Sequence, residues 1–517
     1  MEKKTAYLVV HNANIITMDP LWPRAQLIAV EGERITWVGA NEDLEIVRGP
    51  RTQIIDCQGK TVVPGFHDAH CHIMAYAATF LSVDCSPASV SSIADIQSAV
   101  RQRAATAPEG SWIRATGYNE FYLTEKRHPT RWDLDQAAPD HPVKLTHRTG
   151  HACVLNSLGL SLVGIGIEME EPPGGTIERD LETGEPNGLL LEMDAYLSEK
   201  IPPLTDEELR KGVKLASQTY LTHGITSLQD ATASNGLAQW QTLRRLRDSG
   251  ELVPRVRMMV GIDALSEFTG SCSPDSLRDS QVPLGAVKIV VDEGSGTLYP
   301  SQAELEEQVF MAHRAGLQVA VHAVEEGAVE AAARALLKAL HEFPRENHRH
   351  RVEHCSVCPP SVLKKLKEAQ VVIVTQPSFL YHNGERYLVE VPEAQLRWLY
   401  RIKSFQENGL MPAASSDSPV VPVDPLVGIY AAVTRRAETG QVLSPEERIS
   451  PHQALWMYTV GGAYSAFEEE AKGSIAVGKT ADFAILSHDP TQVPAEEIQE
   501  IKVEMTVLGG KVVWERS

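Results

Sequence analysis

Apolar and polar residues alternate in short stretches at both ends of the chain, and β-branched residues are frequent in them. The alternating segments are 7–10, 26–30, 35–38 and 53–55 near the N-terminus, and 482–486 and 503–514 near the C-terminus. The last segment contains Gly509-Gly510, a dipeptide typical of a tight hairpin turn. We therefore expect one discontinuous β-domain built from both termini.

The middle of the chain shows a different pattern, in which short apolar runs are separated by helical periodicity, as in 304–314 and 327–340. This alternation is typical of parallel strands joined by crossover helices. The runs are 62–66, 225–228, 256–260, 287–291, 319–322, 351–354, 371–375 and 411–415. Eight strand–helix steps favour a TIM-type (β/α)8 barrel over an open doubly wound sheet.

The gap between the first two runs is too long for an ordinary loop. It contains the strand-like segments 111–116 and 143–146. We interpret it as an insertion after the first barrel strand.

The composition and net charge of the chain limit the kinds of molecule that it is expected to bind. The chain has 517 residues, of which 43% are hydrophobic, and its 48 Lys and Arg against 68 Asp and Glu give a formal charge of −20. Such a charge disfavours binding to nucleic acid or anionic membranes, and we find no apolar run of the ~18 residues that a membrane helix needs.

The seven cysteines are an odd, sparse set rather than a disulfide framework. With no leader pattern at the start, we expect a cytoplasmic protein, and a homodimer as the commonest assembly.

The strongest local signal is Pro64-Gly65-Phe66-His67-Asp68-Ala69-His70-Cys71-His72. In an extended chain, residues i and i+2 point to the same face, so His70 and His72 can both face the barrel axis at the C-terminal end of a strand. Neutral imidazoles are the commonest metal ligands. Taken alone, the pair fits two solvated histidines as well as it fits a metal site.

Further residues of metal-ligating type lie at the ends of other predicted strands. Lys288 lies within the fourth apolar run, His322 ends the fifth, His354 ends the sixth and Asp417 follows the eighth. Active sites of TIM barrels gather at the C-terminal ends of the strands. The candidate metal ligands are therefore His70, His72, Lys288, His322, His354 and Asp417.

Two of these residues need a chemical explanation. Lys288 is flanked by Val287 and Ile289, which indicates burial, and an unpaired buried ammonium is costly. A neutral amine, an ion pair with Asp292, or a carbamate formed with CO2 would each avoid that cost. Asp417 suits a general base, because a carboxylate beside a metal-activated water can accept its proton and return it to the leaving group. The alternative for Asp417 is a turn-forming aspartate.

Several motifs, in order along nearly the whole chain, are similar to those of one known family. They are the histidine motif at 64–72, Gly150-His151, Gly224-Ile225-Thr226-Ser227, Arg351-Val352-Glu353-His354, Ser415-Ser416-Asp417 and Gly473-Ser474-Ile475. The chain resembles the amidohydrolase superfamily and, within it, the YtcJ-like branch that includes N-substituted formamide deformylase. The segment 322–326 departs from the branch pattern, since it reads His-Ala-Val-Glu-Glu in place of His-Ala-x-Gly-Asp, and the pocket walls therefore differ.

The resemblance implies a distorted TIM barrel over 65–469, with the insertion at about 75–205, and a small β-sandwich made of 1–64 and 470–517. It implies one or two zinc ions on the six candidate ligands, with Lys288 as an N6-carboxylated lysine. The implied reaction is attack by metal-activated hydroxide on a carbon–nitrogen bond of a small amide, N-substituted formamide or cyclic amide, with Asp417 as the general base. It also implies that His151 lines the substrate pocket.

Three further polar residues at strand ends or in the insertion are substrate-binding candidates, namely Arg148, Glu192 and Asp230. Such residues are as often structural as functional. Two other functions stay open, which are deamination of a heterocycle by the same metal site and an inert metal-binding scaffold. Lys288 favours hydrolysis over deamination, because deaminases of the superfamily usually lack the carbamate, and the intact Asp417 argues against a scaffold.

Overall fold

The computed structural model describes residues 6–172, 174–269, 281–293 and 296–517. The chain divides into two compact units. The first is made of 1–72, 217–417 and 423–517, and the second of 73–216 and 418–422.

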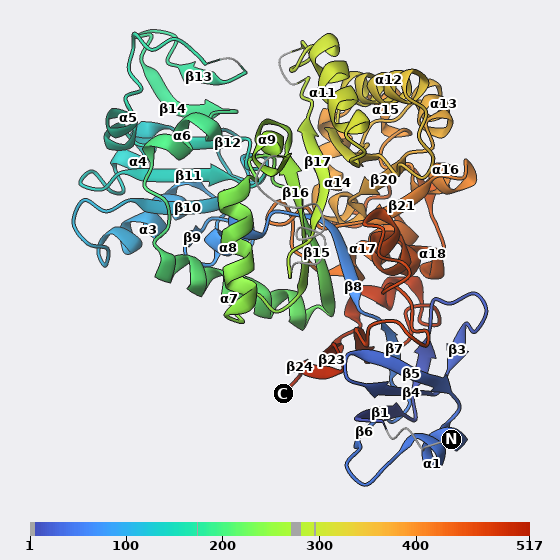
Figure 1. Cartoon of the computed structure of the whole chain (residues 1–517). Coiled ribbons are helices and arrows are strands. Elements are labelled where there is room, and N and C mark those ends of the chain that lie inside the picture. Colours follow the sequence, from blue (N-terminus) through green and yellow to red (C-terminus); the bar gives the residue numbers. More distant parts are fainter. Residues whose placement is uncertain (1–5, 173, 270–280, 294–295) are drawn as a thin grey trace. The chain divides into compact units, whose positions relative to one another are not determined.

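The first unit contains an eight-stranded parallel sheet that curls into a nearly closed barrel (Figure 1). Its strands, in spatial order, are β8 (Phe66–Cys71), β15 (Ile225–Asp230), β16 (Arg255–Gly261), β17 (Leu284–Val290), β18 (Val319–Ala323), β19 (Arg351–His354), β20 (Val372–Thr375) and β21 (Met411–Ala414). The two edge strands meet just beyond β21, where the backbone N–H of Asp417 donates to the carbonyl of His70 at 2.9 Å. The predicted TIM-type α/β fold is confirmed.

The expected first barrel strand, 62–66, is wrong. Residues Thr61–Pro64 form β7, which pairs with β22 (Phe483–Leu486) and β2 (Asn14–Ile16) of the terminal β-domain. The barrel begins after Gly65, where a Cβ would overlap the side chain of Thr226, so only glycine fits at this junction. Because the barrel strand starts at Phe66, His70 lies inside β8 rather than beyond its end.

Alternation along the barrel strands decides which side chains face the helices. One apolar cluster joins the strands to α11 (Gln302–Arg314), α12 (Glu326–Glu342) and α13 (Pro360–Glu368). Its members from three adjacent strands are Val287, Ile289, Val321, Ala323 and Val352. The residues between or beside these positions, Lys288, His322 and Glu353, therefore point to the barrel interior.

Both ends of the chain build a β-sandwich of two sheets. One sheet has the order β5 (Arg34–Gly39), β4 (Leu27–Glu31), β1 (Leu8–His11), β6 (Gln53–Asp56), and the other has the order β24 (Lys511–Glu515), β23 (Val503–Leu508), β22, β7, β2, β3 (Arg24–Ala25). A shared apolar core between the sheets includes Val10, Val62 and Phe483. The β23–β24 hairpin turns at Gly509 and Gly510, both with positive φ, as the sequence predicted. The exact division at 1–64 and 470–517 stays a prediction.

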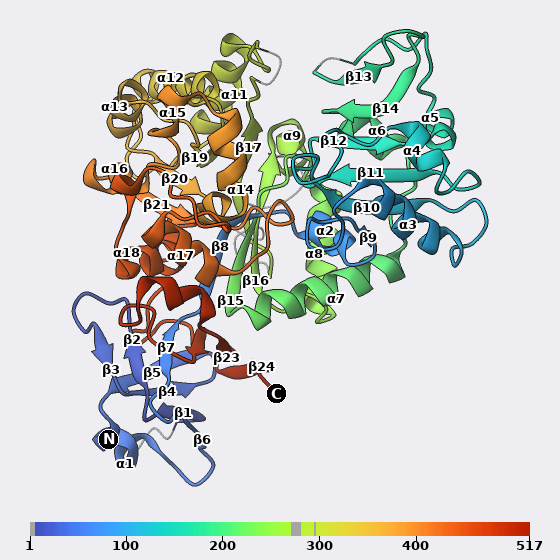
Figure 2. The ribbon, with the colours of Figure 1, turned by 180° about the vertical axis from the view of Figure 1, so that it is seen from behind.

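The second unit is built around a six-stranded mixed sheet (Figure 2). Its order is β13 (Thr176–Arg179), β14 (Pro186–Leu191), β12 (Ala152–Leu155), β11 (Val143–His147), β10 (Ile113–Tyr118) and β9 (Val83–Asp84). The helices of this unit include α3 (Ile93–Ala104), α5 (Ser157–Val163) and α6 (Asp194–Lys200). The two strands expected inside the insertion correspond to β10 and β11.

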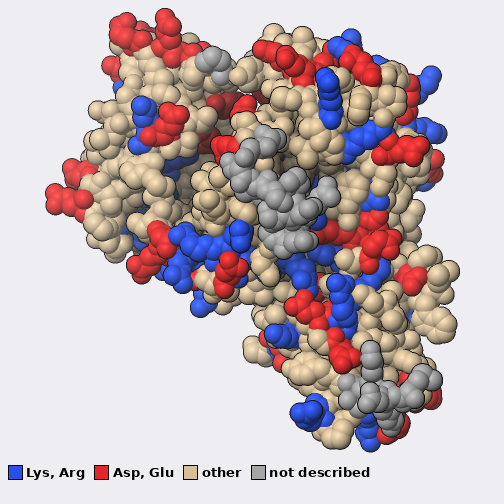
Figure 3. Space-filling view, in the orientation of Figure 1, with Lys and Arg blue, Asp and Glu red and all other residues tan. Residues whose placement is uncertain are grey.

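The surface carries charges of both signs (Figure 3), and most of the cysteines lie in the interior. Lys and Arg side chains are interspersed with Asp and Glu over the face drawn in Figure 3. Six cysteines are buried and free, while Cys272 lies outside the described residues. Among the described helices, none combines the length and the apolar character that a membrane crossing requires.

Three buried histidines lie beside the starts of β18 and β19. The backbone N–H of Val319 donates to His350 Nδ1 at 3.0 Å, so the proton of His350 is on Nε2, which lies 2.8 Å from His313 Nδ1. His313 Nε2 in turn lies 2.7 Å from the carbonyl oxygen of Phe343. These contacts use both nitrogens of both rings in their neutral forms. Burial holds the pKa of His350 well below its usual value and lowers the pKa of His348, whose Nδ1 accepts from the backbone N–H of His350, to about 4.

We expect acid to destabilise the wild-type protein more steeply than the variant His348→Gln. The folded-state pKa of about 4 lies below the unfolded value of 6.5, so the unfolded chain binds an extra proton between these values. The contribution of neutral His348 to the free energy of unfolding is therefore fully present above pH 6.5 and is lost as the pH falls toward 4. The free energy of unfolding changes by at most ~1.4 kcal/mol per pH unit for one proton. Tm measured from pH 7 to pH 5 tests this, with the exposed His452→Gln as control. Equal slopes for wild type and His348→Gln would contradict the prediction.

Candidate active site at the C-terminal end of the barrel

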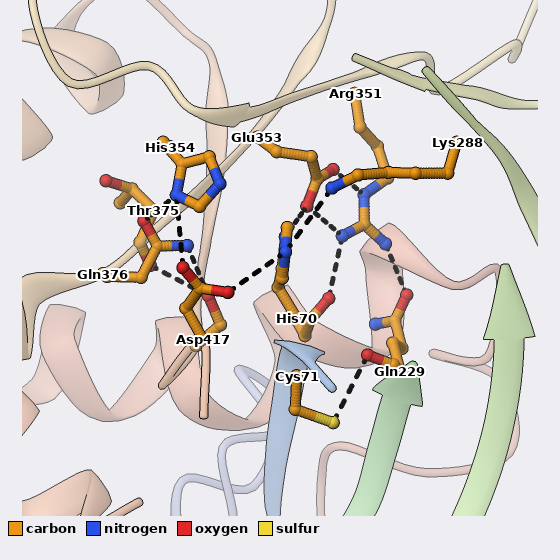
Figure 4. Close-up of polar contacts among 12 residues, drawn as sticks. His70, Cys71, Gln229, Lys288, Arg351, Glu353, His354, Thr375, Gln376 and Asp417 are labelled. Carbon is orange, nitrogen blue, oxygen red and sulfur yellow. Dashed lines mark hydrogen bonds and ion pairs between the residues drawn. The ribbon is translucent and has the colours of Figure 1, made fainter. Parts of the chain in front are cut away.

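Three predicted ligands converge inside the barrel mouth. His70 of β8, His354 at the end of β19 and Asp417 just after β21 each offer one ligand atom, and these atoms lie within 4.8 Å of one another. His72 joins them, since its Nε2 lies 3.1 Å from Asp417 Oδ1. The structure thus brings together residues from three strands that are far apart in the sequence (Figure 4).

The three imidazoles share one arrangement. In each ring Nδ1 contacts a fixed oxygen, which is Glu353 Oε2 at 2.5 Å for His70, Thr232 Oγ1 at 3.0 Å for His72 and Gln376 Oε1 at 2.8 Å for His354. When Nδ1 carries the proton, Nε2 keeps its lone pair for another ligand. The Nε2 atoms of His70 and His72 both lie toward Asp417 Oδ1, at 3.4 and 3.1 Å.

Two buried polar atoms at this point lack a hydrogen-bond partner among the described residues. They are Nε2 of His354 and Oδ1 of Asp417. Buried polar atoms in native proteins are nearly always satisfied, so each such atom needs an explanation. A divalent cation explains both, because an imidazole lone pair and a carboxylate oxygen are ordinary ligands of zinc. The residues present therefore fit a metal.

Lys288 of β17 and His322 of β18 lie beside the converging ligands. Lys288 is buried, and its Nζ lies 3.4 Å from His70 Nε2. Burial lowers the pKa of Lys288 to about 8, which increases the fraction of neutral amine, the form that reacts with CO2. The His322 ring is half-buried and lies 4.4 Å, centroid to centroid, from the ring of His354.

Asp417 is held by its backbone and by its charge environment. Its φ is 56°, in the left-handed region that non-glycine residues rarely adopt, and His354 has a φ of 65°. Strain of this kind clusters at functional sites. Burial opposes ionisation, but the nearby imidazoles of His70, His72 and His354 hold the pKa of Asp417 well below its usual value, so it is a carboxylate at neutral pH.

Asp68 anchors the loop that carries Asp417. Its carboxyl oxygens accept from the backbone N–H of Ser416 at 3.0 Å, from Ser416 Oγ at 2.5 Å and from the backbone N–H of His70 at 3.3 Å. Burial raises the pKa of Asp68 to about 6. Asp68 therefore ties β8 to the segment after β21 and links the positions of two candidate ligands.

The substrate-binding candidates fall into both units. Asp230 ends β15 in the first unit, where it is buried and accepts from Asn235 Nδ2 at 2.7 Å. In the second unit His151 Nδ1 lies 2.8 Å from Glu192 Oε1, and both side chains are about half exposed. The backbone N–H of Arg148 donates to the carbonyl of Tyr118 at 3.1 Å. The structure thus brings His151 and Glu192 together, and the substrate role of all four residues stays a prediction.

Sequence reasoning missed the residues that hold the ligands. These are Glu353 and Gln376, which contact ligand histidines, Arg351, which contacts Glu353, and Asp68. One signal was available, because Arg351 and Glu353 interrupt an apolar strand at positions i and i+2, and charged residues are rarely buried unless they are paired.

A (β/α)8 barrel with these side chains at the C-terminal strand ends is the arrangement expected of a metal-dependent hydrolase. The model of the amidohydrolase family matches residues 53–514 of this chain. The chain therefore belongs to the amidohydrolase family, and it is a metal-dependent hydrolase that acts on carbon–nitrogen bonds other than peptide bonds.

Individual relatives agree over nearly the full length. The chain is 29% identical to N-substituted formamide deformylase of Arthrobacter pascens, over 99% of this chain and 98% of that protein. It is 27% identical to the YtcJ protein of Bacillus subtilis, over 98% and 99% of the two chains. Among solved structures, a metal-dependent hydrolase from Pyrococcus furiosus matches with a TM-score of 0.71 and 27% identity, over 94% of this chain and 100% of that one. The resemblance to the YtcJ-like branch is confirmed.

We expect Asp68→Ala to destabilise the protein and to disturb the site together. The change removes three hydrogen bonds to a buried carboxyl group and leaves the Ser416 donors without it, at a cost of about 3 kcal/mol. Tm should fall by several degrees, and hydrolytic activity should fall in protein that is still folded at the assay temperature. The exposed Asp56→Ala serves as control. An Asp68→Ala protein with wild-type Tm and activity would show that the loop needs no such anchor.

Proposed function

We propose that the protein hydrolyses the carbon–nitrogen bond of a small amide, N-substituted formamide or cyclic amide, with Asp417 as the general base. The observation that carries this proposal is the unpartnered, buried Oδ1 of Asp417, which lies 3.1 and 3.4 Å from the Nε2 atoms of His72 and His70. A carboxylate so placed is ionised and faces the point where a water molecule would be activated.

The proposed ligands are His70, His72, Lys288 as a carbamate, His322, His354 and Asp417. A divalent cation bound there, with zinc as the proposed ion and one or two per chain, supplies Lewis-acid chemistry that acidifies water and polarises a carbonyl group. In the conversion of Lys288, its neutral amine adds to the carbon of CO2 and loses a proton, which leaves an anionic carbamate. The new charge removes the repulsion that an ammonium would exert on a cation.

Asp417 moves the proton in this reaction. One of its carboxylate oxygens accepts a proton from the attacking water as the water oxygen bonds to the carbonyl carbon. When the carbon–nitrogen bond breaks, the same oxygen returns the proton to the departing nitrogen, and the products are a carboxylic acid and an amine. The low pKa of Asp417 keeps the carboxylate ionised at neutral pH, which is the form that can accept a proton.

The substrate class is supported by the name of the relative from Arthrobacter pascens, N-substituted formamide deformylase. At 29% identity, the pocket walls differ in detail, so the individual substrate is left to screening. His151, Arg148, Glu192 and Asp230 are the proposed substrate contacts. We retain the sequence-based expectations of a small-molecule substrate, a homodimer and a cytoplasmic location.

We expect purified protein to contain zinc, and intact-mass analysis under gentle conditions to show one added CO2. The variant Lys288→Met should lack the added mass and lose metal, because the carbamate is both a ligand and a counter-charge. Elemental analysis measures the metal content of both proteins. Full metal content in Lys288→Met would remove Lys288 from the ligand set, and failure of the wild type to take up zinc on reconstitution would overturn the metal site.

We expect Asp417→Asn to lower kcat for hydrolysis by about 10²–10⁴, the usual contribution of a general base. The matched control is Asp489→Asn, since the side chain of Asp489 is 8% exposed, as is that of Asp417, and is paired with Arg24 in the β-sandwich. Product formation from N-substituted formamides, cyclic amides and amino-heterocycles is measured with the zinc content of each variant. Turnover confined to amino-heterocycles would favour deamination, and full hydrolysis by Asp417→Asn would assign the base elsewhere.

A further inference from the structure

A buried ion pair lies inside the barrel beneath the candidate ligands. TIM-barrel interiors are usually filled by branched apolar side chains. Here Arg351 and Glu353 of β19 occupy the interior, and both are fully buried. Arg351 Nε donates to Glu353 Oε1 at 2.7 Å, and Arg351 Nη2 donates to Glu353 Oε2 at 2.8 Å. A bidentate pair of this kind keeps the carboxylate charged and fixed in orientation.

Glu353 is the only charged group among the three acceptors that the structure places on the Nδ1 atoms of His70, His72 and His354. Its Oε2 lies 2.5 Å from His70 Nδ1, the shortest of the three contacts. A carboxylate has no proton to give, so Nδ1 is the donor and Nε2 keeps its lone pair. That lone pair faces Asp417 Oδ1 and Lys288 Nζ, each 3.4 Å from Nε2.

Arg351 reaches His70 by a second route. Its Nη2 also donates to the carbonyl oxygen of Ala69, the residue before His70, at 2.8 Å. Its Nη1 donates to Oε1 of Gln229 on β15 (Figure 4). One guanidinium therefore ties β19 to β8 and β15, and it fixes both the backbone beside His70 and the acceptor of its side chain.

We propose that Glu353 is a positioning residue that presets the tautomer and orientation of His70 for a divalent cation, with Arg351 as its clamp. This inference rests on the proposed function. In this role Glu353 acts through His70 and does not contact the substrate. A carboxylate behind a ligand imidazole also raises the basicity of Nε2, so loss of the carboxylate weakens metal binding even when the fold survives.

The test uses apo and zinc-loaded full-length protein, with the variants Glu353→Gln, Glu353→Ala and Arg351→Met. Zinc affinity is measured by competition with a chromophoric chelator. The His70 tautomer is read from ¹⁵N shifts of histidine-labelled apo protein, with His70→Gln identifying its signals. Glu353→Gln keeps the side-chain volume and one acceptor oxygen, so it is the variant best able to fold.

A matched control is available at Glu447. This glutamate is also buried and lies 3.4 Å from an arginine, Arg401, but it accepts from Ser404 rather than from a ligand histidine. Glu447→Gln therefore makes the same chemical change away from the site. It should lower stability without moving zinc affinity or the signals of His70.

We expect the zinc dissociation constant to rise about 10–100-fold in Glu353→Gln and at least as much in Glu353→Ala. We also expect His70 to change from a pure Nδ1–H tautomer in the wild type to a mixture in Glu353→Ala. Wild-type affinity and an unchanged tautomer in the folded Glu353 variants would overturn the positioning role. If the wild type itself bound no zinc, the proposed function would fail, and the tautomer comparison alone would decide the role of Glu353.

Discussion

The geometry of the site depends on one interaction, the buried pair of Arg351 and Glu353 inside the barrel. Removing two charges from water is expensive, and such a pair survives only when the remaining donors and acceptors are also satisfied. That condition is met here, because the guanidinium also donates to Gln229 and to the backbone of Ala69, while the carboxylate also accepts from His70. Through these contacts the pair links β19 to β8 and β15 at the level just below the site.

Above this layer, His354 and Asp417 adopt a left-handed backbone conformation that turns their side chains toward the site. Successive side chains of a strand point to opposite faces, so Glu353 and His354 should face opposite ways. The left-handed backbone at His354 breaks this alternation, and both side chains reach the interior. Asp417 has a similar backbone conformation, and its position is set by hydrogen bonds from neighbouring residues to Asp68. The Arg351–Glu353 layer and the left-handed residues His354 and Asp417 together direct the candidate ligand atoms to one point.

The same facts explain what could be read from the sequence. The barrel followed from the spacing of apolar runs, and the convergence of His70, His354 and Asp417 followed from the rule that strand ends meet. The first barrel strand was misplaced because the apolar run 62–66 spans the end of β7 and the start of β8, and the tight contact at Gly65 falls between the two sheets. Glu353 was missed because strict alternation places it away from His354. A positive φ at a non-glycine residue leaves no trace in composition or periodicity, so that exception could not be foreseen.

The discontinuous sandwich has a consequence for how the protein is made. The strand β7 leads directly into β8 and its ligand His70, but one of its partners, β22, is formed by residues 483–486, which are synthesised long after β7. While residues 418–482 are being made, the edge of β7 that pairs with β22 therefore has no native partner, although every proposed metal ligand has already been synthesised. A nascent or prematurely terminated chain would carry the complete ligand set beside an open β-edge, which is the kind of surface that chaperones shield and that aggregation exploits. Maturation of this enzyme would thus wait for the strand at residues 483–486, which lies far from His70 in sequence.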